Sequence, residues 1–384
     1  MSGFWPLLRN HMKHSSQKNK TAGDSHALLA MAGHLLSAAQ WRDSLRLVAH
    51  PSLWISMVSG LQVGLSVLLV IVLTHFSPWS HLVGFASLGG LTALFGRFAP
   101  LKERRRIVTV TALLMTLAVL LPSLAAWAGA TPWMLIGVLT LCVGMFTLMA
   151  SHLRLGVPGA VIIVFATGAA LLPVADMGTV IERTLATLAG GISACVVCTC
   201  TDWLRRKSLA TLHLPQPMVQ PLRKELLIAL RVMVGAGLAA AISHAAGWAY
   251  PAWAAIGATA VMQGSHLHIT MNRALQRMLG TIAGAALCAV ILTTEPSFWV
   301  VVAWIVAFQL LTEVLMGFNY ALGQLTVTPM ALLMTYLAAP QSVALNLPLA
   351  RVMDTVLGAV LGILFAVILS SVDDRKHLAQ LRSK

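Results

Sequence analysis

Twelve apolar segments of membrane-spanning length follow one another along this chain of 384 residues. A helix that crosses the hydrocarbon core of a bilayer needs roughly 20 apolar residues, and fewer where other helices shield it. The segments therefore predict an all-α polytopic membrane protein with about 12 transmembrane helices. The predicted spans are 51–76, 80–97, 107–128, 132–152, 156–175, 179–201, 225–247, 250–265, 275–293, 297–317, 320–338 and 347–371.

Composition agrees with a membrane protein and argues against nucleic acid as a partner. Hydrophobic residues make up 58% of the chain, charged residues make up 10%, and the mean hydropathy is +0.82. A soluble protein of this size could not hide so much apolar surface from water. The net charge of +14 sits in the first fifty residues, the short loops and the last ten residues, as charge does when it sets orientation in a membrane. Membrane lipids are the expected surroundings.

The distribution of Lys and Arg predicts both the orientation and the organisation of the chain. Basic residues fall in the loops on one side, and the loops on the other side carry none. By the positive-inside rule, both termini are then cytoplasmic. An amphipathic helix on the membrane surface is one reading of 26–48, and a disordered basic tail with a short helix is the other. The predicted parts are an N-terminal segment (1–50), a first membrane half (51–201), a linker (202–224), a second membrane half (225–371) and a C-terminal tail (372–384).

The two halves resemble each other. The stretch from Pro78 to Ala112 recurs from Pro251 to Gly284, and Arg-led helices begin at Arg183 and at Arg351. Because six predicted spans precede the linker, the two six-helix halves share one orientation. They should therefore be related by an axis along the membrane normal.

A shorter motif recurs within each half: Arg, then Thr four residues later, then Gly three residues after that. This spacing puts the three side chains on one helix face. In the predicted topology, two copies lie at the cytoplasmic side and two at the outer side, as a three-plus-three inverted repeat in each half would produce. The copies are Arg183/Thr187/Gly190, Arg277/Thr281/Gly284, Arg351/Thr355/Gly358 and the degenerate Arg105/Thr109/Ala112.

These arginines predict an anion path with two positive charges at each mouth. Arginine stays charged and can bind a carboxylate with two parallel hydrogen bonds. The Thr hydroxyl one turn away can donate to the same anion, and the Gly permits close helix approach. The alternative is structural, because an Arg near a helix end often extends its guanidinium to the lipid headgroups.

Two acidic residues in the second half are candidates for proton coupling. Glu313 is placed deep in a predicted span, where a carboxylate is costly. Its alternative is a position near the cytoplasmic end, paired with Arg277 or a lysine. Asp354 follows Arg351 by three residues, so an intrahelical ion pair is the alternative there.

The sequence predicts neither a metal site nor a cofactor. No His pair has a carboxylate or Cys partner at ligand spacing, and the spacing Cys195-x-x-Cys198 lies in an apolar helix. Nothing resembles a phosphate-binding Walker loop, so ATP hydrolysis is not expected. No His-Asp, Ser-His or metal constellation lies at a predicted membrane face, so an enzyme is not expected either. Trp residues gather at the predicted outer boundaries, where an aromatic belt is the ordinary reading. Trp253 is also a candidate for stacking an aromatic substrate.

The second half resembles the fusaric acid resistance family of bacterial membrane proteins. The resemblance lies in Tyr250-Pro-Ala-Trp-Ala-Ala-Ile-Gly, Asn272-Arg273-Ala-Leu-Gln-Arg277, Asn319-Tyr320-Ala-Leu and Arg351-Val-Met-Asp354-Thr355. The family is associated with proton-driven export of aromatic carboxylic acids across the inner membrane, and is distantly similar to plant aluminium-activated malate channels. The site residues that the resemblance implies are Arg277, Thr281, Asn319, Tyr320, Arg351 and Asp354.

Together these features predict a transporter that exports a small organic anion, with an aromatic carboxylate favoured. A passive anion channel is the nearest alternative, and a membrane enzyme or an assembly subunit is the alternative from another class. The chain lacks the long cytoplasmic domain of the larger exporters, which leaves a periplasmic adaptor open. The sequence also leaves open a homo-oligomer.

Overall fold

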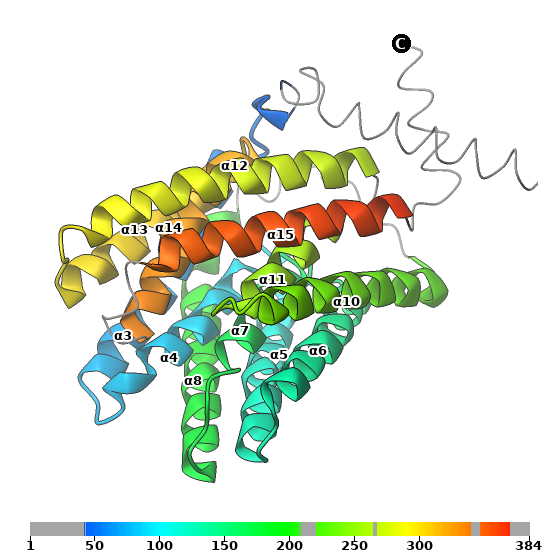
Figure 1. The fold of residues 1–384 in the computed structure, drawn as a ribbon. Helices are drawn as coiled ribbons and strands as arrows, with labels where there is room; N and C mark the ends of the chain where they lie inside the picture. The colour runs from blue at the N-terminus through cyan, green and yellow to red at the C-terminus, as the bar shows by residue number, and fades with distance from the viewer. Residues whose placement is uncertain are drawn as a thin grey trace, which may run out of the picture. The chain divides into compact units, whose positions relative to one another are not determined.

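A computed structural model describes residues 42, 44–206, 208, 220–263, 267–338 and 346–368. Within these ranges the chain forms twelve α-helices and no β-strand (Figure 1). The prediction of an all-helical protein is confirmed. Most of 26–48, the segment read as an amphipathic helix or a basic tail, lies outside the described residues, as do most of the linker and the C-terminal tail. Residues 1–46 form a separate unit, and everything below concerns the unit that begins at Leu47.

Six α-helices lie in each half of the sequence. Those of the first half are α3 (Leu53–His75), α4 (Val83–Gly90), α5 (Leu101–Trp127), α6 (Pro132–His152), α7 (Ala160–Ala169) and α8 (Met177–Thr201), with the short 3-10 helices η1 (Ser80–Leu82), η2 (Leu91–Leu94) and η3 (Asp202–Arg205). Those of the second half are α10 (Leu222–Ala245), α11 (Pro251–Met262), α12 (Leu267–Leu292), α13 (Phe298–Leu315), α14 (Tyr320–Ala338) and α15 (Leu347–Ile368).

Helix starts follow local capping chemistry. The Ser52 hydroxyl accepts a hydrogen bond from the Ile55 N–H at the start of α3, and the Asp176 carboxylate accepts one from the Thr179 N–H at the start of α8. These side chains satisfy N–H groups that the first turn leaves without a partner. Thr131 does the same for α6, where Pro132 occupies the first helical position. A proline is tolerated there because its missing N–H would be unpaired in any case.

Eight helices in the described part of the chain are long and apolar enough to cross a membrane: α3, α5, α6, α10, α12, α13, α15 and α8 together with η3. This confirms a multi-pass membrane protein. The helices α4, α7 and α11 are shorter. The difference is largest at the predicted span 156–175, of which only the ten residues of α7 are helical. Gly156 and Gly159 adopt left-handed φ values of 72° and 69° on either side of Pro158, and this backbone delays the helix start.

Helix packing in one half has a counterpart in the other. In the first half, α8 packs against α4 and α5, and in the second half α15 packs against α11 and α12. Likewise α3 packs on α4, and α10 packs on α11. Between the halves, α3 packs on α13 and α10 packs on α6. Figure 1 shows α12 and α15 lying side by side along much of their length.

Close backbone contact holds the α4–α8 and α11–α15 pairs together. A Cβ at Gly190 would overlap the Ala86 carbonyl oxygen, and a Cβ at Gly358 would overlap the Ala254 carbonyl oxygen. Small residues at a crossing allow backbones to approach in this way, which is how membrane helices gain packing energy without a hydrophobic drive. The third position of the recurring motif is therefore a packing position in both halves.

We expect Gly190→Ala to prevent formation of a stable folded protein, because the contact that the new methyl group meets is backbone that cannot move aside. The matched control is Gly137→Ala in α6, where a Cβ would meet nothing within 4 Å. Alanine at an open helical site usually stabilises by about 1 kcal/mol relative to glycine. Yield of monodisperse protein after detergent extraction distinguishes the two variants. Equal yields would contradict the close α4–α8 crossing.

Candidate anion-binding site

Two buried arginines of the second half lie near each other. Arg277 on α12 and Arg351 on α15 are 2% and 3% exposed, and their charges interact. The Arg277 guanidinium donates through Nη1 to the Tyr320 hydroxyl at 3.1 Å and to the Gln324 Oε1 at 3.4 Å. The structure thus brings together three of the predicted site residues, whereas the predicted topology put Arg277 and Arg351 at opposite mouths of the path. Gln324, one turn beyond Tyr320, is a partner that sequence reasoning did not select.

The start of α14 is set beside Arg277 by two neighbouring residues. The Asn319 side chain accepts a hydrogen bond from the Ala321 N–H at 2.7 Å and so caps α14. A Cβ at Gly280 would overlap the Ala321 carbonyl oxygen, so the glycine lets α12 and α14 approach closely. The positive end of the α14 dipole therefore lies at the same place as the arginine charge, and both favour an anion.

An aromatic wall covers the other arginine. The Arg351 guanidinium lies over the Trp253 ring, 5.2 Å from its centroid, and the Tyr250 ring stacks on Trp253 with centroids 4.2 Å apart. Trp253 is only 6% exposed, whereas Trp79 and Trp133 are each more than half exposed. Trp253 is therefore a buried wall of this site, while the exposed tryptophans suit the aromatic belt.

Several donors in this region have no partner within the described protein. They are Nε and Nη1 of Arg351, Nε of Arg277, and the buried hydroxyls of Thr281 and Thr355. Each threonine follows its arginine by one turn on the same helix face. A buried polar group without a partner costs about 1–3 kcal/mol, and native proteins rarely leave several of them together. The arrangement suits a negatively charged ligand that accepts these hydrogen bonds.

Asp354 is a fully buried carboxylate next to this cluster. Its Oδ1 accepts a hydrogen bond from the Ser243 hydroxyl of α10 at 2.6 Å, and its Oδ2 has no partner. Among the described residues, no ion pair within 4.0 Å joins Asp354 to Arg351, although their charges interact. The predicted intrahelical ion pair is thus replaced by a hydrogen bond to a neighbouring helix.

The first-half copy of the motif has a different environment. Arg183 lies over the Phe85 ring at 5.2 Å, matching the stacking of Arg351 on Trp253. Its Nη1 and Nη2, however, donate to the carbonyl oxygens of Leu172 and Pro173 at 3.1 and 2.9 Å. Thr187 is buried and donates to the Arg183 carbonyl. This arginine therefore holds the segment that precedes α8.

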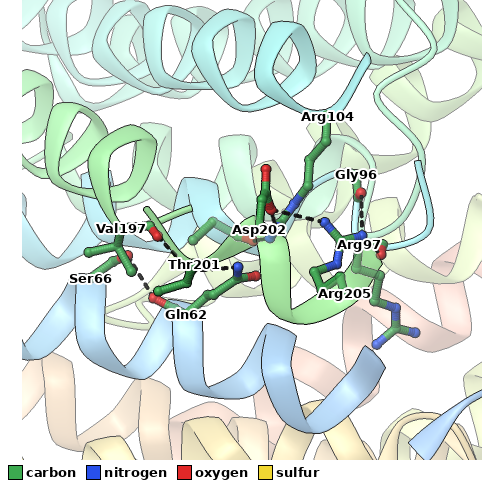
Figure 2. A network of polar contacts seen from close by, with 10 residues as sticks. Gln62, Ser66, Gly96, Arg97, Arg104, Val197, Thr201, Asp202 and Arg205 are labelled. Carbon is green, nitrogen blue, oxygen red and sulfur yellow. Dashed lines mark hydrogen bonds and ion pairs between the residues drawn. The ribbon is translucent and has the colours of Figure 1, made fainter. Parts of the chain in front are cut away.

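The degenerate copy on α5 is placed differently again. Arg105 and Thr109 are exposed, and the neighbouring Arg104 is fully buried. Figure 2 shows Arg104 and Arg205 directed at the Asp202 carboxylate. Arg104 lies 2.5 Å from Asp202 and Arg205 lies 3.3 Å from it. We call these three residues the Asp202 cluster, and sequence reasoning did not identify it.

The Asp202 cluster connects to the other candidate for proton coupling. Arg205 also donates to the Arg97 carbonyl oxygen, and the Arg97 side chain donates to Glu313 on α13 at 2.9 Å. Glu313 is 5% exposed. Its partner is thus an arginine of the first half and not Arg277, which faces Tyr320. Among the described residues, no group of three His, Cys, Asp or Glu side chains is arranged to hold a metal ion.

The anion-site residues, from Ser243 to Thr355, all lie in one part of the chain that matches a known family. Residues 238–365 match the fusaric acid resistance protein-like family. The predicted resemblance is confirmed for this segment. The chain is also similar to the uncharacterized membrane protein YvaC of Bacillus subtilis (strain 168), with 34% identity over 135 residues, which is 35% of this chain and 21% of YvaC. No solved structure matches the chain. The similarity to aluminium-activated malate channels stays a prediction.

Proposed function

We propose that this protein exports small organic anions, with aromatic carboxylates favoured, through a path that passes between Arg277 and Arg351. The observation that carries the proposal is a pair of buried arginines in which Nε of Arg277 and both Nε and Nη1 of Arg351 have no partner within the described protein. The match of residues 238–365 to the fusaric acid resistance protein-like family supports the proposal. The alignment with YvaC covers only about a fifth of that protein. The proposed activity therefore rests on the arginine site and not on YvaC.

In this proposal each residue of the site has a role. Arg277 and Arg351 bind the carboxylate with paired hydrogen bonds, and Thr281 and Thr355 donate their hydroxyls to it. Trp253 and Tyr320 contact the aromatic ring of the substrate. Asn319 fixes the start of α14, and a carboxylate couples proton movement, with Glu313 and Asp354 as the candidates. Arg105 and Arg183 complete the two mouths of the path, and Arg183 would release the carbonyls of Leu172 and Pro173 when the outer mouth opens.

The matched packing of the halves supports an architecture of two six-helix repeats related by an axis along the membrane normal. The glycine contacts at Gly190 and Gly358 and the stacked Arg183 and Arg351 occupy corresponding places in this arrangement. We place the protein in a bacterial inner membrane with both termini cytoplasmic, as the loop charges predict. The nested three-plus-three inverted repeat and the need for a periplasmic adaptor stay predictions.

Flux into proteoliposomes tests the proposal. We expect radiolabelled benzenesulfonate and malate to accumulate against their gradients only when a pH gradient is imposed. A sulfonate stays ionised and so does not cross the lipid as a neutral acid, which makes protein-free liposomes a clean control. Flux that only equilibrates would favour a channel. If the protein moves no anion, an assembly subunit or a membrane enzyme becomes the favoured function.

A passive channel is the second candidate, and one physical fact favours it. An inside-negative membrane potential drives an anion outward by itself, with about 2.3 kcal/mol per charge for each 100 mV. A channel would carry a current that follows the electrochemical gradient and persists in Glu313→Gln. A carrier that uses Glu313 would lose its coupling in that variant.

A further inference from the structure

We propose that Asp354 takes up the coupled proton and that this proton binds together with the anion, so that both cross the membrane in the same direction. The inference rests on the proposed function and assigns one of its two acidic candidates. It also fixes the sign of the coupling. Because an inward proton gradient would drive such co-transport inward, export would be driven by the outward concentration gradient of the anion itself.

Glu313 is already neutralised by a partner. Its carboxylate lies 2.9 Å from the Arg97 guanidinium, and that arginine is itself mostly buried. Breaking a buried ion pair by protonating one member leaves the other charge uncompensated, which is costly. Glu313 therefore functions best as a fixed ionic contact between α13 and the loop that precedes α5.

Asp354 has no such partner. Its carboxylate is fully buried, and among the described residues no ion pair within 4.0 Å reaches it and no group donates a hydrogen bond to Oδ2. The charge is therefore held in place only by a hydroxyl and by the field of a nearby arginine. Protonation of Asp354 breaks no ion pair within 4.0 Å among the described residues, and it removes a buried carboxylate charge to which a single hydroxyl donates a hydrogen bond.

The charges around Asp354 come from the anion site itself. Arg351 precedes it by three residues on α15, and the charge of Arg351 in turn interacts with Arg277 of α12 and with Tyr320 of α14. The helix α10 contributes the neutral Ser243, and the ring of the adjacent His244 packs edge-on against Trp133 of α6. The helix α11 contributes the uncharged Trp253.

The sign of the coupling follows from this arrangement. When Asp354 is ionised, it and a bound carboxylate are two like charges that share the same two arginines. Protonation of Asp354 removes the repulsion, so the anion binds more tightly. By linkage, a bound anion raises the proton affinity of Asp354 by the same factor. An exchanger that moves a proton against an anion requires the opposite sign, because there the two ligands must exclude each other.

Binding of radiolabelled benzoate to the purified full chain in detergent tests the inference between about pH 6 and pH 8, where a carboxylic acid of ordinary pKa stays ionised. We expect the wild type to bind roughly tenfold more tightly at the lower pH, within the usual range of coupling between sites. Asp354→Asn mimics the protonated acid, so it should bind tightly at both pH values. Glu313→Gln should keep the wild-type pH dependence. Benzoate added to weakly buffered wild-type protein should also cause proton uptake.

Three results would overturn the inference while leaving the proposed function intact. In the first, the wild type binds benzoate with an affinity that does not change with pH, and Arg277→Ala abolishes this binding. In the second, wild-type binding weakens as the pH falls. In the third, Asp354→Asn keeps the pH dependence of the wild type. The first two need no Asp354 variant, so they decide the matter even if that variant does not fold. Absence of benzoate binding by the wild type would instead overturn the proposed function together with the inference.

Discussion

Arg351→Met is expected to abolish anion transport while leaving the protein at least as stable as the wild type. The Arg351 guanidinium is buried with Nε and Nη1 unpaired, and each unsatisfied group costs about 1–3 kcal/mol. Methionine fills the space of the aliphatic part of the arginine side chain without burying a charge. A buried charge that is retained despite this cost indicates a functional site, where stability is commonly lost for activity.

Two measurements on the same preparation test this expectation: benzenesulfonate flux in proteoliposomes and thermal unfolding in detergent. Arg277→Met should also abolish flux, but it leaves Tyr320 and Gln324 without their donor, so it should gain less stability than Arg351→Met. The control is Arg106→Met, which removes an exposed arginine outside the site. Near-wild-type flux in Arg351→Met would show that the arginine pair does not bind the transported anion.

Asp202→Asn is expected to lower the free energy of unfolding by about 3–5 kcal/mol, the usual effect of removing one member of a buried ionic group. Asp202 is the carboxylate shared by Arg104 and Arg205, and both arginines are fully buried. The amide keeps the shape of the side chain but leaves two positive charges facing each other. This is the opposite of the expectation for Arg351, although all of these arginines are buried.

Denaturant or thermal unfolding of the purified protein measures this effect. The matched control is Glu182→Gln, which also neutralises a paired carboxylate. Glu182 is 3.2 Å from His81, but its side chain is 39% exposed, and exposed ion pairs contribute about 0–1 kcal/mol. If Asp202→Asn unfolds like the wild type and like Glu182→Gln, the Asp202 cluster does not stabilise this fold.

The length of the apolar segments predicts the helices well, because the thickness of a bilayer determines how many apolar residues a span needs. The bounds of α6 and α14 agree with the predicted spans 132–152 and 320–338. The predicted starts of α5 and α12 lie several residues too late, because charged residues near the beginning of each helix lower the local hydropathy. Arg104 shows why this failed: a charged residue can begin a helix and still be buried when a distant carboxylate meets it.

The motif predicted which residues share a helix face, but it could not predict which copy keeps its donors unpaired. That depends on contacts between segments far apart in the sequence. Arg183 donates to carbonyls of the loop before α8, whereas the Arg351 guanidinium lies over the uncharged ring of Trp253 and its Nε and Nη1 have no partner among the described residues. The partner of Glu313 likewise lies 216 residues away, beyond the reach of any local pattern.

The packing between the halves restricts the motions available to a transporter. Because α3 packs on α13 and α10 packs on α6, separating the halves as rigid bodies would break two helix interfaces at once. A smaller movement keeps both. Close glycine contacts join α11 to α15 and α12 to α14, and α12 also packs against α15. Arg351 lies on α15 and Arg277 on α12, so an anion held by both arginines would bridge the α12–α15 interface, and its release would let these two helices shift along each other.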